Sequence, residues 1–199
     1  MIRKKSLNFK LNIEYHSSEE RFHVFMEEFC PDQEICPFCG AVGTCCIYKY
    51  YKRYIIDYYD GRVVVSTLRI TRVICSCGHT HAILPDFIIP YRQYSLPFIL
   101  HILRVYLSRT MTLKTILNTF GVSHQLLGQW LRTFRDHKDL WLGSLDSRTM
   151  SAPAFLEQLL DSDPFSVFSY DFYLKTLFSF LQTHPNPANC CQSPPGGLF

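Results

Sequence analysis

The chain has 199 residues, of which 47% are hydrophobic and 15% aromatic, and its formal net charge is +3. This composition excludes a disordered chain and fits one ordinary domain or two small ones. No apolar run reaches the roughly 18 residues that span a bilayer. The basic start is not followed by the apolar core of a signal peptide, so we expect a cytoplasmic protein without a membrane partner.

Residues 1–30 predict a strand followed by a helix. Apolar residues alternate with polar ones from Leu7 to Ile13, as in a half-buried strand. Ser17 and Glu20 then have the spacing of a capping box, in which each side chain accepts a hydrogen bond from the other residue's backbone N–H. We therefore expect an amphipathic packing helix from Ser17 to about Cys30.

Two close cysteine pairs follow: Cys36 and Cys39 are three residues apart, and Cys75 and Cys77 are two apart. The chain has nine cysteines, an odd number, and cytosolic thiols stay reduced, so a disulfide framework is not expected. Four thiolates are the shell that Zn²⁺ takes in structural sites, which leave no open position for chemistry. The pairs therefore predict a structural zinc site.

The second pair leaves the fourth ligand open. Cys75 and Cys77 have a single residue between them, which strains a standard two-residue knuckle. An imidazole also binds zinc, so His79 or His81 is an alternative ligand in place of Cys75 or Cys77.

Residues 46–74 carry the clearest β signal. Asp60-Gly61 is a tight-turn dipeptide between two stretches rich in tyrosine and β-branched residues. One long hairpin would bring the cysteine pairs together, which predicts a zinc ribbon over residues 31–90. Residues 46–135 hold 12 Lys+Arg and 3 Asp, a net charge of +9, so a surface that faces a polyanion is expected. On the hairpin, the basic face would consist of Lys49, Lys52 or Arg53, Arg69 and Arg72.

Residues 83–97 contain three prolines, which exclude a long helix and predict an extended connector and domain boundary. A helix-turn-helix domain is expected over residues 95–138, after an N-cap at Ser95. Its core pattern is a helix over 112–120, a turn at Gly121 with a cap at Ser123, and a second helix that carries Trp130. The apolar face between these helices would consist of Ile116, Phe120, Val122, Leu127, Trp130 and Leu131.

The second helix of this pattern would present polar side chains to solvent. Glutamine and arginine make bidentate contacts to adenine and guanine in the major groove of DNA. Phosphate contacts would come from Arg109 and Lys114, and also from Arg92 and Arg104. The candidate DNA-binding residues on the second helix are His124, Gln125, Gln129, Arg132 and Arg135.

Residues 150–183 predict two more helices, broken near Asp163-Pro164, whose dense aromatic residues pack on the body or form a homodimer surface. Residues 184–199 predict an irregular tail. The scattered aspartates build no two-metal carboxylate cluster, and no phosphate loop or nucleophile motif is present. We therefore expect neither an enzyme nor a small-molecule substrate.

The order of these motifs resembles a family of bacterial transposase-related proteins of unknown function, in which a zinc ribbon precedes a helix-turn-helix. The same order of motifs is similar to the N-terminal DNA-binding region of insertion-sequence transposases. Such transposases continue into an RNase H-like domain with three carboxylates on Mg²⁺, and the 64 residues after Arg135 are too few for that fold. The resemblance implies DNA recognition without strand transfer. It rests on residues 35–40 (ICPFCG), 72–85 (RVICSCGHTHAILP), 89–91 (IPY) and the helical pattern that ends at Trp130.

These observations predict an α+β protein with a zinc ribbon, a helix-turn-helix domain and C-terminal helices. The expected function is zinc-dependent DNA binding in a mobile-element or regulatory setting. The alternative is a zinc-stapled protein-interaction adaptor that never touches nucleic acid, which the tyrosine-rich hairpin and the aromatic C-terminal helices favour.

Overall fold

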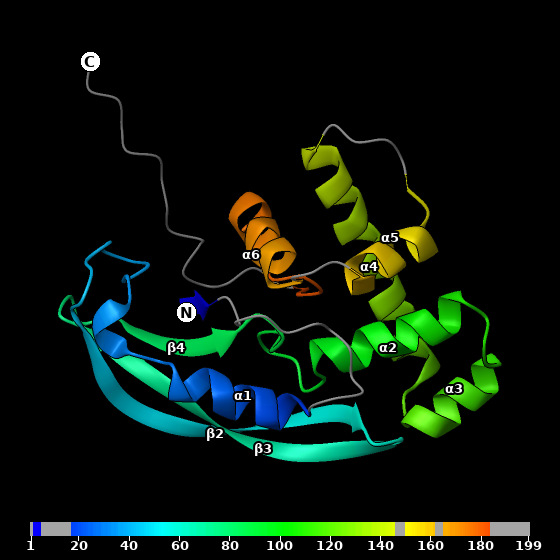
Figure 1. Cartoon of the computed structure of the whole chain (residues 1–199), viewed down its shortest axis with the longest axis horizontal. Coiled ribbons are helices and arrows are strands. Elements are labelled where there is room, and N and C mark those ends of the chain that lie inside the picture. Colours follow the sequence, from blue (N-terminus) through cyan, green and yellow to red (C-terminus); the bar gives the residue numbers. More distant parts are fainter. Residues whose placement is uncertain (1, 5–16, 146–149, 162–164, 184–199) are drawn as a thin grey trace.

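The computed structural model describes residues 2–4, 17–145, 150–161 and 165–183, and within them the fold is α+β, as predicted. A sheet with strand order β1-β4-β3-β2 lies beside six α-helices and one short 3₁₀ helix (Figure 1). The strands are β1 (Ile2–Lys4), β2 (Cys45–Tyr59), β3 (Arg62–Cys75) and β4 (Thr80–Pro85). The helices are α1 (Ser18–Glu27), η1 (Pro31–Gln33), α2 (Leu96–Leu107), α3 (Leu113–Phe120), α4 (His124–Ser144), α5 (Ala152–Asp161) and α6 (Phe165–Thr176).

The predicted hairpin is confirmed. Strands β2 and β3 pair antiparallel along their whole length, from Tyr59 opposite Arg62 to Cys45 opposite Cys75. Asp60 and Gly61 both have positive φ angles, 52° and 72°, as a two-residue hairpin turn of the favoured twist requires. Strand β4 extends the sheet antiparallel to β3, and β1 pairs parallel to β4. These two additional strands were not predicted.

Helix α1 begins as expected. Ser17 and Glu20 form the reciprocal capping box, with the N–H of Glu20 donating to Ser17 Oγ at 3.2 Å. Phe22 and Phe25 on its buried side are only 3% and 7% exposed. The strand predicted from Leu7 to Ile13 and the tail predicted over 184–199 lie outside the described residues.

The first part of the connector after β4, residues 86–90, is buried, whereas Tyr91 and Gln93 are exposed. Phe87, Ile88 and Ile89 are at most 2% exposed. The backbone of Ile56 on β2 exchanges hydrogen bonds with the connector, accepting from Ser95 N–H and donating to the carbonyl of Gln93. One buried cluster runs from the hairpin through the connector into α2–α6, so the sheet and helices are joined by packed side chains.

Asp57 links three elements at this junction. Its carboxylate accepts hydrogen bonds from the N–H of Ser18, at the start of α1, and from the hydroxyl of Ser95 at 2.6 and 2.7 Å. Ser95 Oγ in turn caps α2 by accepting from the N–H of Phe98 at 3.1 Å. A buried carboxylate therefore connects α1, β2 and α2, which is a structural role.

Tyr58 and Tyr94 extend the junction with aromatic contacts. The ring of Tyr58 stacks on His101 of α2, with 4.9 Å between ring centroids, and meets the edge of Phe120 of α3 at 5.1 Å. Tyr94 of the connector meets Trp130 of α4 at 5.0 Å. The hairpin thus packs on α2 and α3, and the connector packs on α4.

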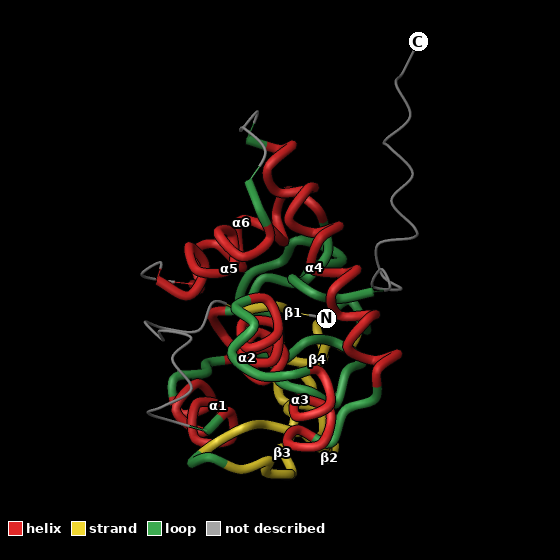
Figure 2. The backbone as a smooth tube through the Cα atoms, turned by 90° about the vertical axis from the view of Figure 1, so that its right-hand side faces the viewer, coloured by secondary structure: helices red, strands yellow, loops and turns green. Residues whose placement is uncertain are grey.

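Helices α2–α6 lie together on one side of the hairpin (Figures 1 and 2). The predicted N-caps Ser95 and Ser123 both accept a backbone hydrogen bond, and Gly121 adopts the left-handed conformation that ends α3. Helices α5 and α6 confirm the two predicted C-terminal helices. They pack on the body of the protein through Phe155 and Phe172. Within the described ranges, no helix combines the length and apolar character that a membrane crossing needs.

Candidate metal centre and helical surface

The two predicted cysteine pairs converge at the far end of the hairpin. The sulfur atoms of Cys36, Cys39, Cys75 and Cys77 all lie within 4.8 Å of one another, with 3.8 Å between Cys36 and Cys77 and 3.6 Å between Cys39 and Cys75. Four sulfurs at about 2.3 Å from a tetrahedral ion are about 3.8 Å apart. These separations far exceed a disulfide bond, so the four cysteines could hold a metal ion.

Local turns place the sulfurs. After the first pair, the N–H of Gly40 donates to the carbonyl of Cys36 at 2.9 Å, and Gly40 has a φ of 73°. After the second pair, Gly78 has a φ of 85° and donates to the carbonyl of Cys75 at 2.8 Å. Both glycines take a backbone conformation that other residues rarely adopt. The turn at Gly78 brings both members of the closely spaced second pair into the cluster.

The thiols cannot all ionise without a cation. The backbone N–H of Cys77 and the hydroxyl of Thr44 donate to Cys75 and lower the pKa of that thiol to about 5. At Cys77 the backbone N–H of His79 lowers the pKa, but loss of hydration and the neighbouring thiols of Cys75 and Cys39 outweigh it and raise the pKa to about 12. Like charges at this distance repel. A bound dication would relieve that repulsion.

Both predicted alternative ligands lie next to the cluster. His81 is buried, which lowers its pKa to about 4, and its Nε2 lies 3.3 Å from Cys36 Sγ. A thiolate at Cys36 can only accept, so a neutral imidazole there donates through Nε2. His79 is exposed, its Nδ1 lies 3.5 Å from Cys77 Sγ, and its ring stacks on Phe38. The four cysteines come together without either imidazole.

Two further residues beside the cluster were missed from the sequence. Thr44 Oγ1 lies 3.1 Å from Cys75 Sγ, and Cys45 pairs with Cys75 across the hairpin. Burial and the neighbouring Cys75 raise the pKa of Cys45 to about 11, so it stays a thiol. Counting back from the turn at Asp60-Gly61 does not place Cys45 opposite Cys75, because the register shifts between Ile47 and Lys49.

Seven of the residues predicted to contact DNA lie on the surface. Those on the second predicted helix belong to α4, Lys114 belongs to α3, and Arg109 follows α2 with a φ of 57°. The apolar face predicted between the helices is buried, including Ile116, Phe120 and Trp130. The exposed residues on one side of α4 are called the α4 strip: His124, Gln125, Gln129, Arg132 and Arg135. Arg109 and Lys114 are exposed as well.

Three other predicted cations have partners within the protein. Arg53 is half-buried, and its guanidinium donates to the carbonyls of Ile89 and Arg92 instead of facing outward. Arg92 Nη2 donates to Thr183 at 2.9 Å, and Arg92 Nη1 lies 3.5 Å from Gln129 Oε1.

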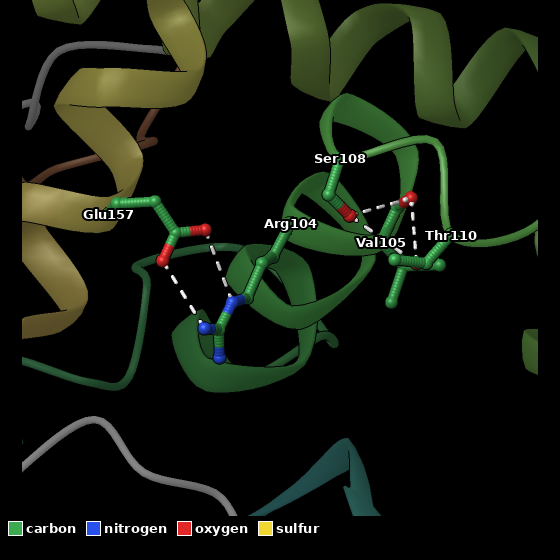
Figure 3. A network of polar contacts seen from close by, with 5 residues as sticks. All are labelled: Arg104, Val105, Ser108, Thr110 and Glu157. Atoms are coloured by element: carbon green, nitrogen blue, oxygen red, sulfur yellow. Dashed lines mark hydrogen bonds and ion pairs between the residues drawn. The ribbon is translucent and has the colours of Figure 1, made fainter.

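Arg104, the third of these cations, pairs with Glu157 of α5 (Figure 3). The two side chains make a two-point contact, with both N–O distances at 3.2 Å. Beyond Arg104, Ser108 and Thr110 donate to the carbonyl of Val105 and close the end of α2 (Figure 3). Arg104 is therefore paired with the first of the C-terminal helices, and its phosphate contact stays a prediction.

Residues 36–116 match a protein family described as a domain of unknown function (DUF6431). The matched stretch begins at the first cysteine of the cluster and ends within α3, so it includes all four cysteines and stops short of α4. Neither the curated proteins nor the solved structures yield a match. The similarity covers less than half of the chain and brings no activity with it.

Proposed function

We propose that this chain is a zinc-dependent DNA-binding protein, with transposase-like DNA recognition, no catalytic domain and a mobile-element or regulatory role. The observation that carries the proposal is the α4 strip. Its residues Gln125, Gln129 and Arg132 are exposed on the second helix of a helix–glycine turn–helix arrangement. These side-chain types read base edges in the major groove. The net charge of residues 46–135 favours a polyanionic partner.

Zinc is the metal that best suits the cysteine cluster. Four thiolates at tetrahedral spacing form a soft donor set, which favours Zn²⁺ over the hard cations that bind through oxygen. In this proposal Cys36, Cys39, Cys75 and Cys77 are the ligands, and the hairpin with its knuckles is a zinc ribbon. The ion would hold the ends of the hairpin together and leave DNA contact to other residues.

A gel shift against pooled genomic fragments tests the DNA-binding role. We expect binding that weakens steeply with salt, because each neutralised phosphate contributes roughly −0.9 to the slope of log K against log salt. The triple variant Gln125→Ala, Gln129→Ala, Arg132→Ala should lose binding while its circular dichroism spectrum stays unchanged.

The matched control is Gln158→Ala with Lys175→Ala, which removes one amide and one cation from exposed positions on α5 and α6. This control should bind as the parent does. A parent protein that shifts no fragment at low salt would refute the proposal and favour the zinc-stapled adaptor.

A further inference from the structure

One side of the β2–β3 hairpin is exposed and has no described helix over it. The hairpin forms the lower boundary of the molecule in both ribbon views, with the helices above it (Figures 1 and 2). The pairing register puts alternate residues of both strands on this side of the sheet. The buried side chains of Leu68 and Ile70 point to the other side. We define this outer hairpin face by its six exposed residues: Tyr50, Lys52, Tyr54, Val65, Thr67 and Arg69.

The outer hairpin face combines aromatic rings with positive charge. Tyr50 and Tyr54 are 44% and 61% exposed. Lys52 lies between them on β2, directly opposite Arg69, and none of the six residues is acidic. The guanidinium of Arg69 lies 3.8 Å from the centroid of the Tyr50 ring, a cation–π contact that holds both side chains in place. This surface suits an anionic ligand that also carries flat rings.

The spacing of the two rings restricts that ligand further. Tyr50 and Tyr54 are four residues apart on one strand, which corresponds to about 13 Å. Stacked bases along one strand of DNA are only about 3.4 Å apart. A single base cannot reach both rings, so each ring would take a separate base. In a duplex the faces of the bases are hidden between neighbouring pairs, whereas a single strand can splay its bases outward.

We propose that the outer hairpin face binds single-stranded DNA. Bases stack on Tyr50 and Tyr54, and the phosphates between them meet Lys52 and Arg69. Proteins that bind single strands without sequence preference use this combination of aromatic platforms and basic groups. The site goes beyond the proposed function, because it uses other residues and another form of DNA than the α4 strip.

Fluorescence anisotropy with a labelled oligothymidylate of about 15 nucleotides tests the site on the full-length, metal-loaded chain. We expect Tyr50→Ala and Tyr54→Ala each to weaken binding roughly 5- to 100-fold, because each removes one stacking platform. Tyr54→Phe keeps the ring and should retain the affinity of the parent. Tyr170→Ala, which removes an exposed tyrosine of α6, is the matched control and should have no effect.

The salt dependence tests the phosphate contact separately. Lys52→Gln should make the slope of log K against log salt shallower by about 0.7, the contribution of one phosphate on a single strand. The substituted side chains are exposed, so the metal content and circular dichroism spectrum of each variant should match those of the parent.

Two further results distinguish this proposal from the role of α4. The triple variant of Gln125, Gln129 and Arg132 should still bind oligothymidylate, whether or not the parent binds duplex. The proposal is overturned if the parent does not bind oligothymidylate, or if Tyr54→Phe loses as much affinity as Tyr54→Ala. It is equally overturned if sedimentation shows a dimer that Tyr50→Ala and Tyr54→Ala dissociate, because the face would then be an interface between two copies.

Discussion

Cys39 is one of the two exposed members of the cysteine cluster, with Cys77, so its substitution leaves the buried core unchanged. Cys39→Ser leaves three thiolates, and we expect bound metal to fall from about one ion per chain to a small fraction of that after dialysis. Inductively coupled plasma mass spectrometry measures this directly. Cys46→Ser is the control, since Cys46 is also exposed but lies outside the cluster. Full metal content in Cys39→Ser would show that this sulfur is no ligand.

His81 should support the metal site without ligating the ion. His81→Gln removes the imidazole beside Cys36, and loss of such an outer partner typically weakens metal affinity about 10- to 100-fold. Competition with a chromophoric chelator measures the affinity, and the ratio of metal to protein should stay at about one. His79→Gln, at an exposed position, should have a smaller effect. Complete loss of metal in His81→Gln would instead make this histidine a ligand.

Asp57 should contribute more to stability than any exposed aspartate. Asp57→Ala leaves the N–H of Ser18 and the hydroxyl of Ser95 without their acceptor and removes a negative charge beside the buried Arg21. We expect the free energy of unfolding to fall by about 3 kcal/mol. Urea denaturation followed by tryptophan fluorescence measures it. Asp32→Ala, at an exposed site, should change it by less than about 0.5 kcal/mol.

Spacing along the chain was enough to predict which cysteines meet, because a hairpin with a recognisable turn brings its own ends together. It was not enough to predict which cations stay available. Arg53 and Arg104 find partners 36 and 53 residues away, in the connector and in α5. No local pattern indicates such distant partners, so a count of basic residues overestimated the number of cations that make no contact within the protein.

At the level of elements, α4 is joined to the segment after α6 through His137. Its Nδ1 accepts a hydrogen bond from the N–H of Leu181 at 3.0 Å, and burial lowers its pKa from 6.5 to about 4. Protonation is therefore harder in the folded protein than in the unfolded chain. This contribution to stability is complete above pH 6.5 and is lost as the pH falls toward 4, by about 3 kcal/mol in total.

Replacement of this histidine isolates the effect. His137→Asn offers an amide oxygen as acceptor near the same position but does not titrate. We expect the variant to lose less stability than the parent between pH 7 and pH 4, measured by urea denaturation at each pH. His124→Asn, at the exposed start of α4, should follow the parent curve. Identical pH curves for His137→Asn and the parent would contradict the assignment.

Elements whose signals are local were predictable, and those that depend on distant pairing were not. Ser17, Ser95 and Ser123 each cap a helix as expected, because a cap involves only its own first turn. Strands β1 and β4 are short, and their pairing joins residues 2–4 to residues 83–85. Only the folded sheet creates that neighbourhood.

For the whole molecule, the buried side chains form two separate clusters. The larger one joins the hairpin to the helices, and the smaller one surrounds the cysteines with Phe25, Val73 and Ile83. Metal removal by a chelator should therefore loosen one end of the protein and leave the rest folded. Hydrogen exchange should accelerate in residues 34–47 and 73–83 while α2 and α4 keep their protection. Uniform acceleration throughout the chain would show that the metal supports the entire fold.

The α+β class was predictable, but the continuity between its halves was not. Prolines in residues 83–97 correctly excluded a long helix, yet they say nothing about burial. Phe87, Ile88 and Ile89 fill the space between sheet and helices, so buried core lies where a domain boundary was expected. Burial depends on what surrounds a segment, and that is decided by the complete fold.

The packing of Tyr58 against His101 and Phe120 has a mechanical consequence. The hairpin cannot swing relative to α2 and α3 without separating these rings, and α3 and α4 share one buried cluster, so the distance between the outer hairpin face and the α4 strip is fixed by packing. If the two surfaces lay on domains joined by a flexible linker, each could bind its ligand independently of the other. Here any molecule that contacts both surfaces must fit one fixed distance, so the shape of a ligand decides whether it can bind to the two surfaces at once.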